Sequence, residues 1–242
     1  MTRLLFTHLL LLLFGASCRP LQDSATIPYD PALPLAGAAQ YEGAFDVKSS
    51  PYYKTVDFYN QKSGGSLVLL ERFKTIQQAT NVTCGPVSVL MVLEYYGKRQ
   101  GLNEKQIQAL RGTDRDTTYL RHLLRIFDSI GGFEYQSTFD YPEASPETIP
   151  ETFFLGYLRR GIPVIVGSNI WGGHWQIVIG YDTMGTPATA DDVLILAEPY
   201  DTTDHRQDGY TVFPLQHFYE GAWRNYFDPD YEWGLFIAAA PQ

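Results

Sequence analysis

Cysteine is nearly absent from this sequence, whose 242 residues include only Cys18 and Cys84. If Cys18 is removed or modified, no intramolecular disulfide can form and Cys84 is the one thiol left to explain. Basic residues are scarce as well, because 18 lysines and arginines stand against 27 acidic residues, for a net charge of -9. That charge disfavours nucleic acid and anionic membrane surfaces as binding partners.

The sequence also lacks the common signatures of bound cofactors. We find no cluster of metal ligands, no phosphate-binding loop and no dinucleotide fingerprint, so we expect no cofactor. What is present is a composition that is 45% hydrophobic and rich in aromatics, which suits a substantial core. The length suits one large domain, or one domain with a long arm.

The N-terminus has the pattern of a targeting segment. Residues 1–17 combine Arg3, an apolar run too short to span a bilayer, and small residues directly before Cys18. This pattern resembles a bacterial lipoprotein signal, in which Cys18 would carry the lipid; the alternative is ordinary cleavage nearby. We therefore expect a signal peptide at 1–17 and an exported, membrane-anchored protein. Residues 18–45, rich in proline, alanine and glycine, would then be the lipid-anchored cysteine and a flexible tether.

The remainder, residues 46–242, is predicted to form one α+β domain. Helical patterns precede most strand patterns, and this segregated order favours α+β over an alternating βαβ fold. We expect a helical half packed on an antiparallel half, with a cleft between them. The expected helices begin at Cys84 and Asn103 and span Thr118–Ile130 and Glu151–Arg160; the expected strands are Ser66–Phe73, Ile162–Gly167, His174–Tyr181, Val193–Ala197, Tyr210–Val212 and Trp233–Ala240.

Cys84 is the candidate nucleophile. It is followed by Gly85, Pro86 and an apolar run that ends at Gly97. Proline is favoured in a first helical turn, so the thiol is expected at a helix N-terminus, where the backbone dipoles favour the thiolate. The alternative is a buried, inert cysteine, because free cysteines are among the most buried residues.

His174 is the best candidate for an imidazole partner. It opens a predicted strand directly after Gly172-Gly173, a pair that would let the backbone and a substrate approach closely. The alternative is a core histidine between two tryptophans. The other histidines are weaker candidates, because none follows a comparable glycine turn or forms a motif with its neighbours: they are His8, His122, His205 and His217.

Gln78, six residues before Cys84, could provide an oxyanion donor. A side-chain amide N–H and the backbone N–H of Cys84 can together bind the oxygen of a tetrahedral intermediate. Gln77 is an adjacent competitor, and a surface glutamine is the ordinary alternative.

Four segments of the sequence together resemble the papain-like cysteine peptidases. They are Gln78 with TNVTCGPVSVLMVLEYYG, then YLRRGIPVIVG, GGHWQIVIGYD and VLILAEPYD. The resemblance is greatest to the bacteriocin-processing type and its stand-alone relatives, peptidase family thirty-nine and thirty-nine-like. It implies Cys84 as nucleophile, His174 as its partner and Gln78 as oxyanion donor. Where the family has an aspartate before proline, this chain has Glu198-Pro199, so Glu198 would orient the histidine, with Asp201 as a competitor.

The resemblance implies a cysteine hydrolase that cleaves peptide bonds through a thiolate–imidazolium pair and an acyl-enzyme. Its partners would be a peptide or protein substrate and, through Cys18, a membrane. Two alternatives stay open: an inactive peptide-binding module, and a transferase that passes the acyl group to an amine. No transporter segment accompanies the domain, so the leader-peptide specificity of transporter-fused relatives is not carried over. The sequence gives no oligomeric state.

Overall fold

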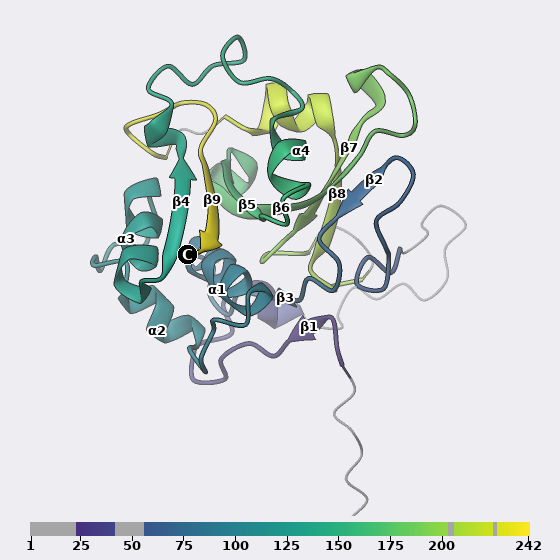
Figure 1. The fold of residues 1–242 in the computed structure, drawn as a ribbon. Helices are drawn as coiled ribbons and strands as arrows, with labels where there is room; N and C mark the ends of the chain where they lie inside the picture. The colour runs from purple at the N-terminus through teal and green to yellow at the C-terminus, as the bar shows by residue number, and fades with distance from the viewer. Residues whose placement is uncertain (1–22, 42–55, 203–205, 225–226) are drawn as a thin grey trace, which may run out of the picture.

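The computed structural model describes residues 23–41, 56–202, 206–224 and 227–242 (Figure 1). The expected signal peptide and Cys18 lie outside these residues. Among the described helices, none is long and apolar enough to span a bilayer.

An antiparallel sheet forms the centre of the domain. Within the described residues it has seven strands, in the order β4-β9-β5-β6-β7-β8, with β2 paired to the far half of β6. A bulge between Val178 and Gly180 divides β6, so that its first half pairs with β5 and its second half with β2. The strands are β2 (Leu67–Leu69), β4 (Phe133–Ser137), β5 (Val164–Ser168), β6 (His174–Asp182), β7 (Val193–Ala197), β8 (Tyr210–Pro214) and β9 (Phe236–Pro241).

The helices pack on this sheet in two groups. α1 contacts β6 and also α2 and α3, whereas α4 packs on β5, β6 and β2 (Figure 1). The α-helices are α1 (Cys84–Tyr95), α2 (Glu104–Ala109), α3 (Leu120–Ile130) and α4 (Phe153–Leu158). Short 3₁₀ turns are η1 (Ala38–Tyr41), η2 (Thr138–Asp140), η3 (Ile170–Gly172) and η4 (Thr189–Asp191), and η5 (His217–Ala222) is a π-helix. The expected α+β architecture is confirmed.

α1 is buried from Cys84 to Leu93, which explains why apolar residues occupy nearly every face of it. Its N-cap residue, Thr83, makes no side-chain cap, because its hydroxyl donates instead to Glu104 at the start of α2. α2 begins with the capping box that its sequence predicts, in which Asn103 and Gln106 exchange hydrogen bonds. The start of α1 is thus held by contacts with the neighbouring helix.

The structure differs from the expected flexible tether at residues 23–41, which pack against the domain. We call this segment the N-terminal arm. Its strand β1 (Thr26–Ile27) pairs in parallel with β3 (Thr75–Ile76). Asp23 forms a salt bridge of 3.0 Å with Lys74 at the same end.

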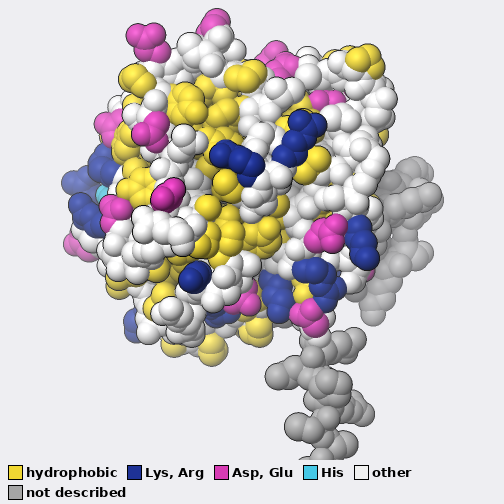
Figure 2. Space-filling model, in the orientation of Figure 1, with side chains coloured by type: hydrophobic (Ala, Val, Ile, Leu, Met, Phe, Trp, Pro, Cys, Tyr) yellow, Lys and Arg dark blue, Asp and Glu magenta, His cyan; other side chains and the backbone are white. Residues whose placement is uncertain are grey.

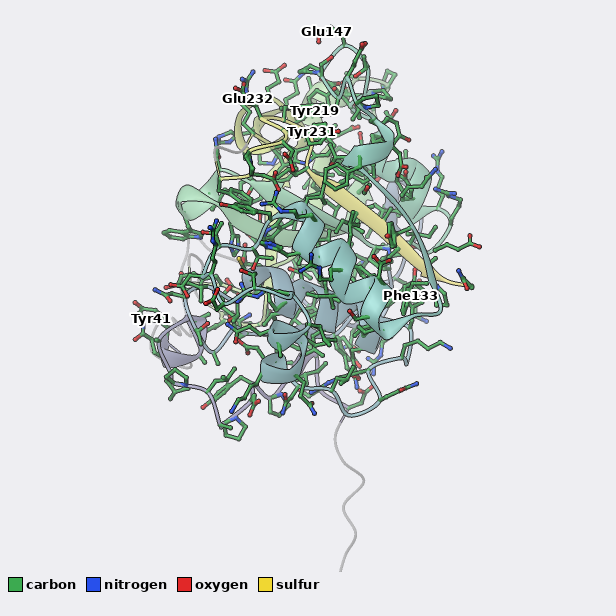
Figure 3. All side chains as sticks on the ribbon, turned by 90° about the vertical axis from the view of Figure 1, so that its left-hand side faces the viewer. Tyr41, Phe133, Glu147, Tyr219, Tyr231 and Glu232 are labelled. Carbon is green, nitrogen blue, oxygen red and sulfur yellow. The ribbon has the colours of Figure 1, made fainter. Side chains whose placement is uncertain are left out.

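Farther along the arm, small residues bring its backbone close to the segment before Cys84. The N–H groups of Ala36 and Gly37 both donate to the carbonyl of Ala79, at 3.0 and 3.1 Å, and that of Ala39 donates to the carbonyl of Gln78 at 3.1 Å. The small residues, which are typical of a linker, therefore allow the two backbones to approach closely here. Bulky side chains would prevent this contact. Figure 3 shows Tyr41, the last residue of η1, at the edge of the molecule.

Two further features lie outside the expected pattern. β4, which was not predicted, pairs with β9 at the edge of the sheet. In the face shown in Figure 2, apolar side chains extend over α4 and this edge, where a hollow of about 280 Å³ is lined in part by Tyr135, Tyr157 and Ala238. Many other aromatic residues are buried in the interior, for example Trp223, whose ring lies 4.8 Å from those of Phe154 and Trp233.

Candidate functional site

Cys84 is the first residue of α1 and lies in the wall of a small cavity. The thiol belongs to a nearly buried residue, 9% exposed, and forms no disulfide. As the first helical residue, Cys84 has no intrahelical acceptor for its N–H. The cavity has a volume of about 170 Å³, and its walls come from the loop before α1, the loop before α3 and the turn before β6: Asn81, Val82, Cys84, Asp116, Thr117, Thr118, Gly172, Gly173, Trp175 and Phe227. It therefore lies where the helical part meets the sheet, as expected for the cleft.

Glycine is required on both sides of this cavity. A Cβ on Gly85 would come within 2.8 Å of the Thr118 side chain, so glycine lets the first turn of α1 pack closely there. Gly173, with φ of 135°, could carry no Cβ without approaching Phe227 to 2.6 Å. Trp171, just before, has a left-handed φ of 56° although it is not glycine, and its side chain is exposed. Such backbone strain is common in segments that line functional sites.

His174 begins β6 and is held against the neighbouring strand β5. It pairs with Ser168 of β5 and is only 2% exposed. Its Nε2 lies 2.5 Å from Oε1 of Glu198, the residue that follows β7. The ring also interacts with the Cys84 thiol. Because Nε2 faces Glu198, Nδ1 is the ring nitrogen left for the thiol.

Glu198 is fixed by further donors. Its Oε1 accepts the backbone N–H of Tyr200 at 2.7 Å, and its Oε2 accepts the side-chain amide of Gln176. Gln176 stands two residues after His174, so both side chains point to the same face of β6. These hydrogen bonds give the carboxylate a defined orientation and satisfy it in a site where Glu198 is only 4% exposed.

The electrostatics favour a protonated imidazole. Burial by itself lowers the pKa of His174, because it disfavours the charged form. The charge of Glu198 and the hydrogen bond with Cys84 oppose burial and raise the pKa to about 10. An imidazolium flanked by a carboxylate and a thiol is the arrangement in which a thiolate is stabilised by an adjacent positive charge.

Asp201 and Gln77, the competitors in the sequence, have other partners. Asp201 Oδ2 accepts the backbone N–H of Gly209 at 2.8 Å. The Gln77 amide donates to the backbone carbonyl of Glu198 at 3.0 Å and accepts the N–H of Asp201 at 3.2 Å. Gln77 therefore holds the segment after β7 in place, whereas the contact with His174 comes from Glu198.

Gln78 lies in the loop before α1 but does not line the Cys84 cavity. Its side-chain N–H group donates to the carbonyl of Thr80 at 2.7 Å, and its Oε1 is buried without a partner. A side-chain amide has two N–H donors, so one remains for another acceptor. The structure thus places Gln78 in the segment that leads to Cys84 and leaves its oxyanion role a proposal.

The other histidines do not join this group. His122 lies in α3, where Nδ1 accepts the N–H of Tyr119 at 3.1 Å and burial lowers its pKa. His217 belongs to η5 and lies near Phe213. His205 lies outside the described residues, as does His8. The described parts of the chain contain no group of three or more histidine, cysteine or carboxylate side chains that could hold a metal ion.

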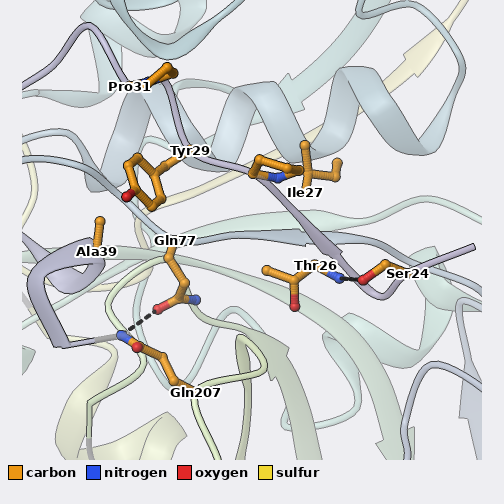
Figure 4. A pocket seen from close by; sticks show the side chains of 9 residues that line it. Ser24, Thr26, Ile27, Tyr29, Pro31, Ala39, Gln77 and Gln207 are labelled. Carbon is orange, nitrogen blue, oxygen red and sulfur yellow. Dashed lines mark hydrogen bonds between the residues drawn. The ribbon is translucent and has the colours of Figure 1, made fainter. Parts of the chain in front are cut away.

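A larger cavity, of about 540 Å³, lies under the N-terminal arm and not at Cys84 (Figure 4). Tyr29 and Pro31 of the arm face Gln77 and Gln207 across it. Its relation to the Cys84 site is indirect, through the hydrogen bond from Gln77 to the Glu198 backbone.

Two buried residues near the site were missed in the sequence. Gln176 could have been found, because its spacing of two from His174 puts both on one face of a strand. Glu104 gave no signal beyond its place at the start of an expected helix, yet it accepts the backbone N–H of Ala79 at 3.2 Å.

Comparisons with known proteins identify a family that matches most of the chain. A family model described as "Peptidase_C39 like family" matches residues 53–229. No match is found among curated proteins. Among solved structures, the chain is similar at 17% identity to a double glycine motif protease from an AMS/PCAT transporter in complex with the leader peptide. That match covers 69% of this chain and 91% of the other, with a TM-score of 0.42, and at this score it carries no argument of its own.

Proposed function

Because this chain belongs to the Peptidase_C39 like family, we propose that it cleaves peptide bonds as a cysteine peptidase, with Cys84 as the nucleophile. The family resemblance read from the sequence is confirmed, and so is the papain-like α+β fold that it implied. A peptidase-type function follows from the family. The thiol mechanism and the residues that carry it are our proposal.

The observation that carries the proposal is that the Glu198 carboxylate holds the buried imidazole of His174, which also interacts with the Cys84 thiol. Glu198 holds the ring through Nε2, which directs Nδ1 at the thiol. We assign Cys84, His174 and Glu198 as the nucleophile, base and orienting group of a hydrolytic triad, since such triads are recognised by geometry and roles and not by chain order. The substitution of glutamate for the aspartate of related sequences is accommodated, since the longer side chain reaches the ring.

The chemistry then follows in two halves. The Cys84 thiolate attacks the carbonyl carbon of the scissile peptide bond and forms a tetrahedral oxyanion. Its collapse breaks the C–N bond, and the leaving amine takes the proton from Nδ1 of His174. A water then gives a proton to that nitrogen as it attacks the thioester, and the carboxylic acid product leaves as the thiolate reforms. Protonated His174 and the thiolate are thus restored together.

The oxyanion needs donors at the start of α1. The backbone N–H of Cys84 has no intrahelical acceptor, and we propose the Gln78 side-chain amide as the second donor. The absence of side chains at Gly172 and Gly173 leaves room for an extended peptide backbone on the opposite wall.

The test is thiol labelling combined with a peptidase assay. Near neutral pH, iodoacetamide should give a single stoichiometric adduct that maps to Cys84, and a pool of fluorogenic peptides should be hydrolysed. Cys84→Ser should abolish hydrolysis and His174→Ala should slow labelling, with both variants folded by circular dichroism. Sluggish labelling, like that of a free thiol with a pKa of about 8.5, would contradict the proposal. Transfer of the peptide to an added amine in place of water would indicate a transferase.

We also propose that the protein is exported and anchored through Cys18. The support is the sequence pattern of residues 1–18.

A further inference from the structure

Arg111 is a buried cation that the proposed mechanism does not use. It follows α2 and is only 2% exposed. Its Nε donates to the carbonyl of Gln108 at 3.2 Å, and its Nη1 donates to the carbonyl of Asp116 at 3.1 Å and to the hydroxyl of Thr118 at 2.8 Å. All of these acceptors are neutral.

A guanidinium in this position calls for a compensating negative charge. Arg111 takes part in none of the salt bridges between described residues, and removing an unpaired charge from water is costly. Arg125 on α3 adds a second cation nearby, because it donates to the carbonyls of Arg111 and Gly112. Burial lowers the pKa of His122 on the same helix, and the charge of Arg111 adds to that shift. The Asp116 carboxylate, in the same loop, forms no salt bridge with Arg111, but its charge favours the guanidinium more than that of any other group.

The structure links Arg111 to Cys84 through Thr118. Thr118 lines the Cys84 cavity and packs directly on Gly85, while its hydroxyl accepts from Arg111. Its carbonyl accepts the indole N–H of Trp175 at 2.8 Å, which fixes the loop against β6. Burial lowers the pKa of Arg111, and the charges of Asp116 and Cys84 oppose that shift, so thiol and guanidinium interact.

We propose that Arg111 is a second, buried positive charge that stabilises the Cys84 thiolate from behind the cavity wall, in addition to His174. This inference rests on the proposed function. Arg111 touches neither substrate nor sulfur through a hydrogen bond, so it acts as an electrostatic and positioning residue. It is useful in the free enzyme, where the thiolate must persist until substrate binds, and again when the thioester breaks. At the second step a sulfur anion must leave while the imidazole is receiving the proton from water, and a fixed cation stabilises it.

The alternative is that Arg111 only clamps the loop at residues 113–118. The two roles differ in the pH dependence of Cys84 alkylation, which a clamp alone would not move. We would measure the rate of iodoacetamide alkylation against pH for the wild type, Arg111→Gln and Arg111→Lys. Arg125→Gln is the matched control, because it removes an exposed positive charge that is bonded to the same loop.

In Arg111→Gln the midpoint pH of alkylation should rise by about one unit, so that labelling below the midpoint is about tenfold slower. Arg111→Lys should restore most of the difference, since it keeps the charge. Arg125→Gln should leave the midpoint unchanged at physiological salt, which screens exposed charges. An unchanged midpoint in a folded Arg111→Gln protein would overturn the inference. The role of Arg111 would then be only to clamp the loop at residues 113–118.

A second measurement needs no Arg111→Gln protein. The guanidinium ¹⁵Nε signal of Arg111, assigned by comparison with Arg111→Lys, should titrate in the unmutated protein with the midpoint of Cys84 alkylation. It should lose that titration in Cys84→Ser. A signal that does not move would refute the coupling. Failure of the proposed function would look different, because the wild type would then neither label rapidly nor hydrolyse peptides, whatever residue stands at 111.

Discussion

Oε1 of Glu198 lies 2.5 Å from Nε2 of His174, whereas the carboxylate of Asp201 binds the backbone N–H of Gly209. Both carboxylates follow β7 and are nearly buried, so burial does not distinguish them. Only the first is positioned to orient the imidazole. The difference can be tested because the isosteric amide of each residue keeps its size and removes its charge.

Glu198→Gln should leave the fold intact and lower turnover by roughly 10- to 100-fold, the range typical of losing a group that orients a functional histidine. Without the carboxylate the imidazolium is less stable, so alkylation of Cys84 should move to higher pH. Asp201→Asn should change turnover much less, because its contact is with a backbone loop. Steady-state kinetics and the alkylation profile check both. If Asp201→Asn were inactive and Glu198→Gln near normal, the orienting role would move to Asp201.

Substitutions of the adjacent residues Gln77 and Gln78 should have different effects, one on stability and the other on turnover. Gln78→Ala should reduce kcat by about 10²-fold with little change in KM, as expected for loss of an oxyanion donor. Gln77→Ala should mainly lower the thermal midpoint, because Gln77 holds the backbone of Glu198 and Asp201. Kinetics with one fluorogenic peptide and thermal unfolding of both variants distinguish the two. A normal kcat in Gln78→Ala would assign the second donor to another group.

Glu104 should make the folded protein less stable as pH rises from about 4.5 to about 7. Burial raises the pKa of its carboxyl from 4.5 to about 7, the hydrogen bonds from Thr83 and Ala79 oppose that shift, and the charge of Asp30 adds to it. Between these values the folded state holds a proton that the unfolded state has released, so the free energy of unfolding falls as pH increases. The full effect is at most about 3 kcal/mol.

Urea unfolding at pH 4.5 and pH 7.5 measures this slope. Glu104→Gln, which resembles the protonated acid, should remove most of it. Glu134→Gln is the control, since Glu134 is exposed on β4 and its replacement should leave the slope unchanged. An equal slope in Glu104→Gln and the wild type would show that another group is responsible.

The N-terminal arm should contribute to stability through one close contact. A Cβ on Gly37 would lie 2.2 Å from the Thr80 carbonyl oxygen, so Gly37→Ala must displace the arm or the loop before Cys84. We expect a loss of about 1–3 kcal/mol, the usual cost of overpacking. Gly64→Ala is the matched control, because nothing lies within 4 Å of its added Cβ. Chemical denaturation of both variants provides the measurement, and equal stabilities would mean that the arm contributes little.

Cys18→Ala should release the protein from the membrane into the soluble fraction. A lipid on this cysteine is the proposed anchor, and stable anchoring needs more than a single acyl chain. Fractionation and mass spectrometry of the mature N-terminus test the prediction. A wild-type protein that is already soluble and begins at another residue would contradict it.

Much of this architecture could be predicted because its signals are local. The expected helix at Thr118–Ile130 has apolar residues at helical spacing and a glycine stop, and it appears as α3. The pair of strands around Gly172-Gly173 forms the expected hairpin of β5 and β6. Cys84, His174 and Glu198 come together because each stands at the end of an element that could be recognised.

The parts that could not be predicted depend on contacts distant in sequence. The N-terminal arm has the composition of a linker, and only its fit against residues 75–80 orders it. Arg111 has the pattern of an ordinary polar residue after a helix, since nothing local indicates that its side chain will be buried behind Thr118. Both cases depend on tertiary packing, which overrides local preference.

β9 is the last strand in sequence, yet it lies between β4 and β5 in the sheet. Until residues 236–241 are available, β4 has no partner strand and β5 has an open edge, so the sheet cannot close while the chain is still emerging. A chain cut at residue 229, where the family match ends, would leave these edges exposed to pairing with other chains. Under the export that we propose, the sheet would stay open at these edges until residues 236–241 had crossed the membrane.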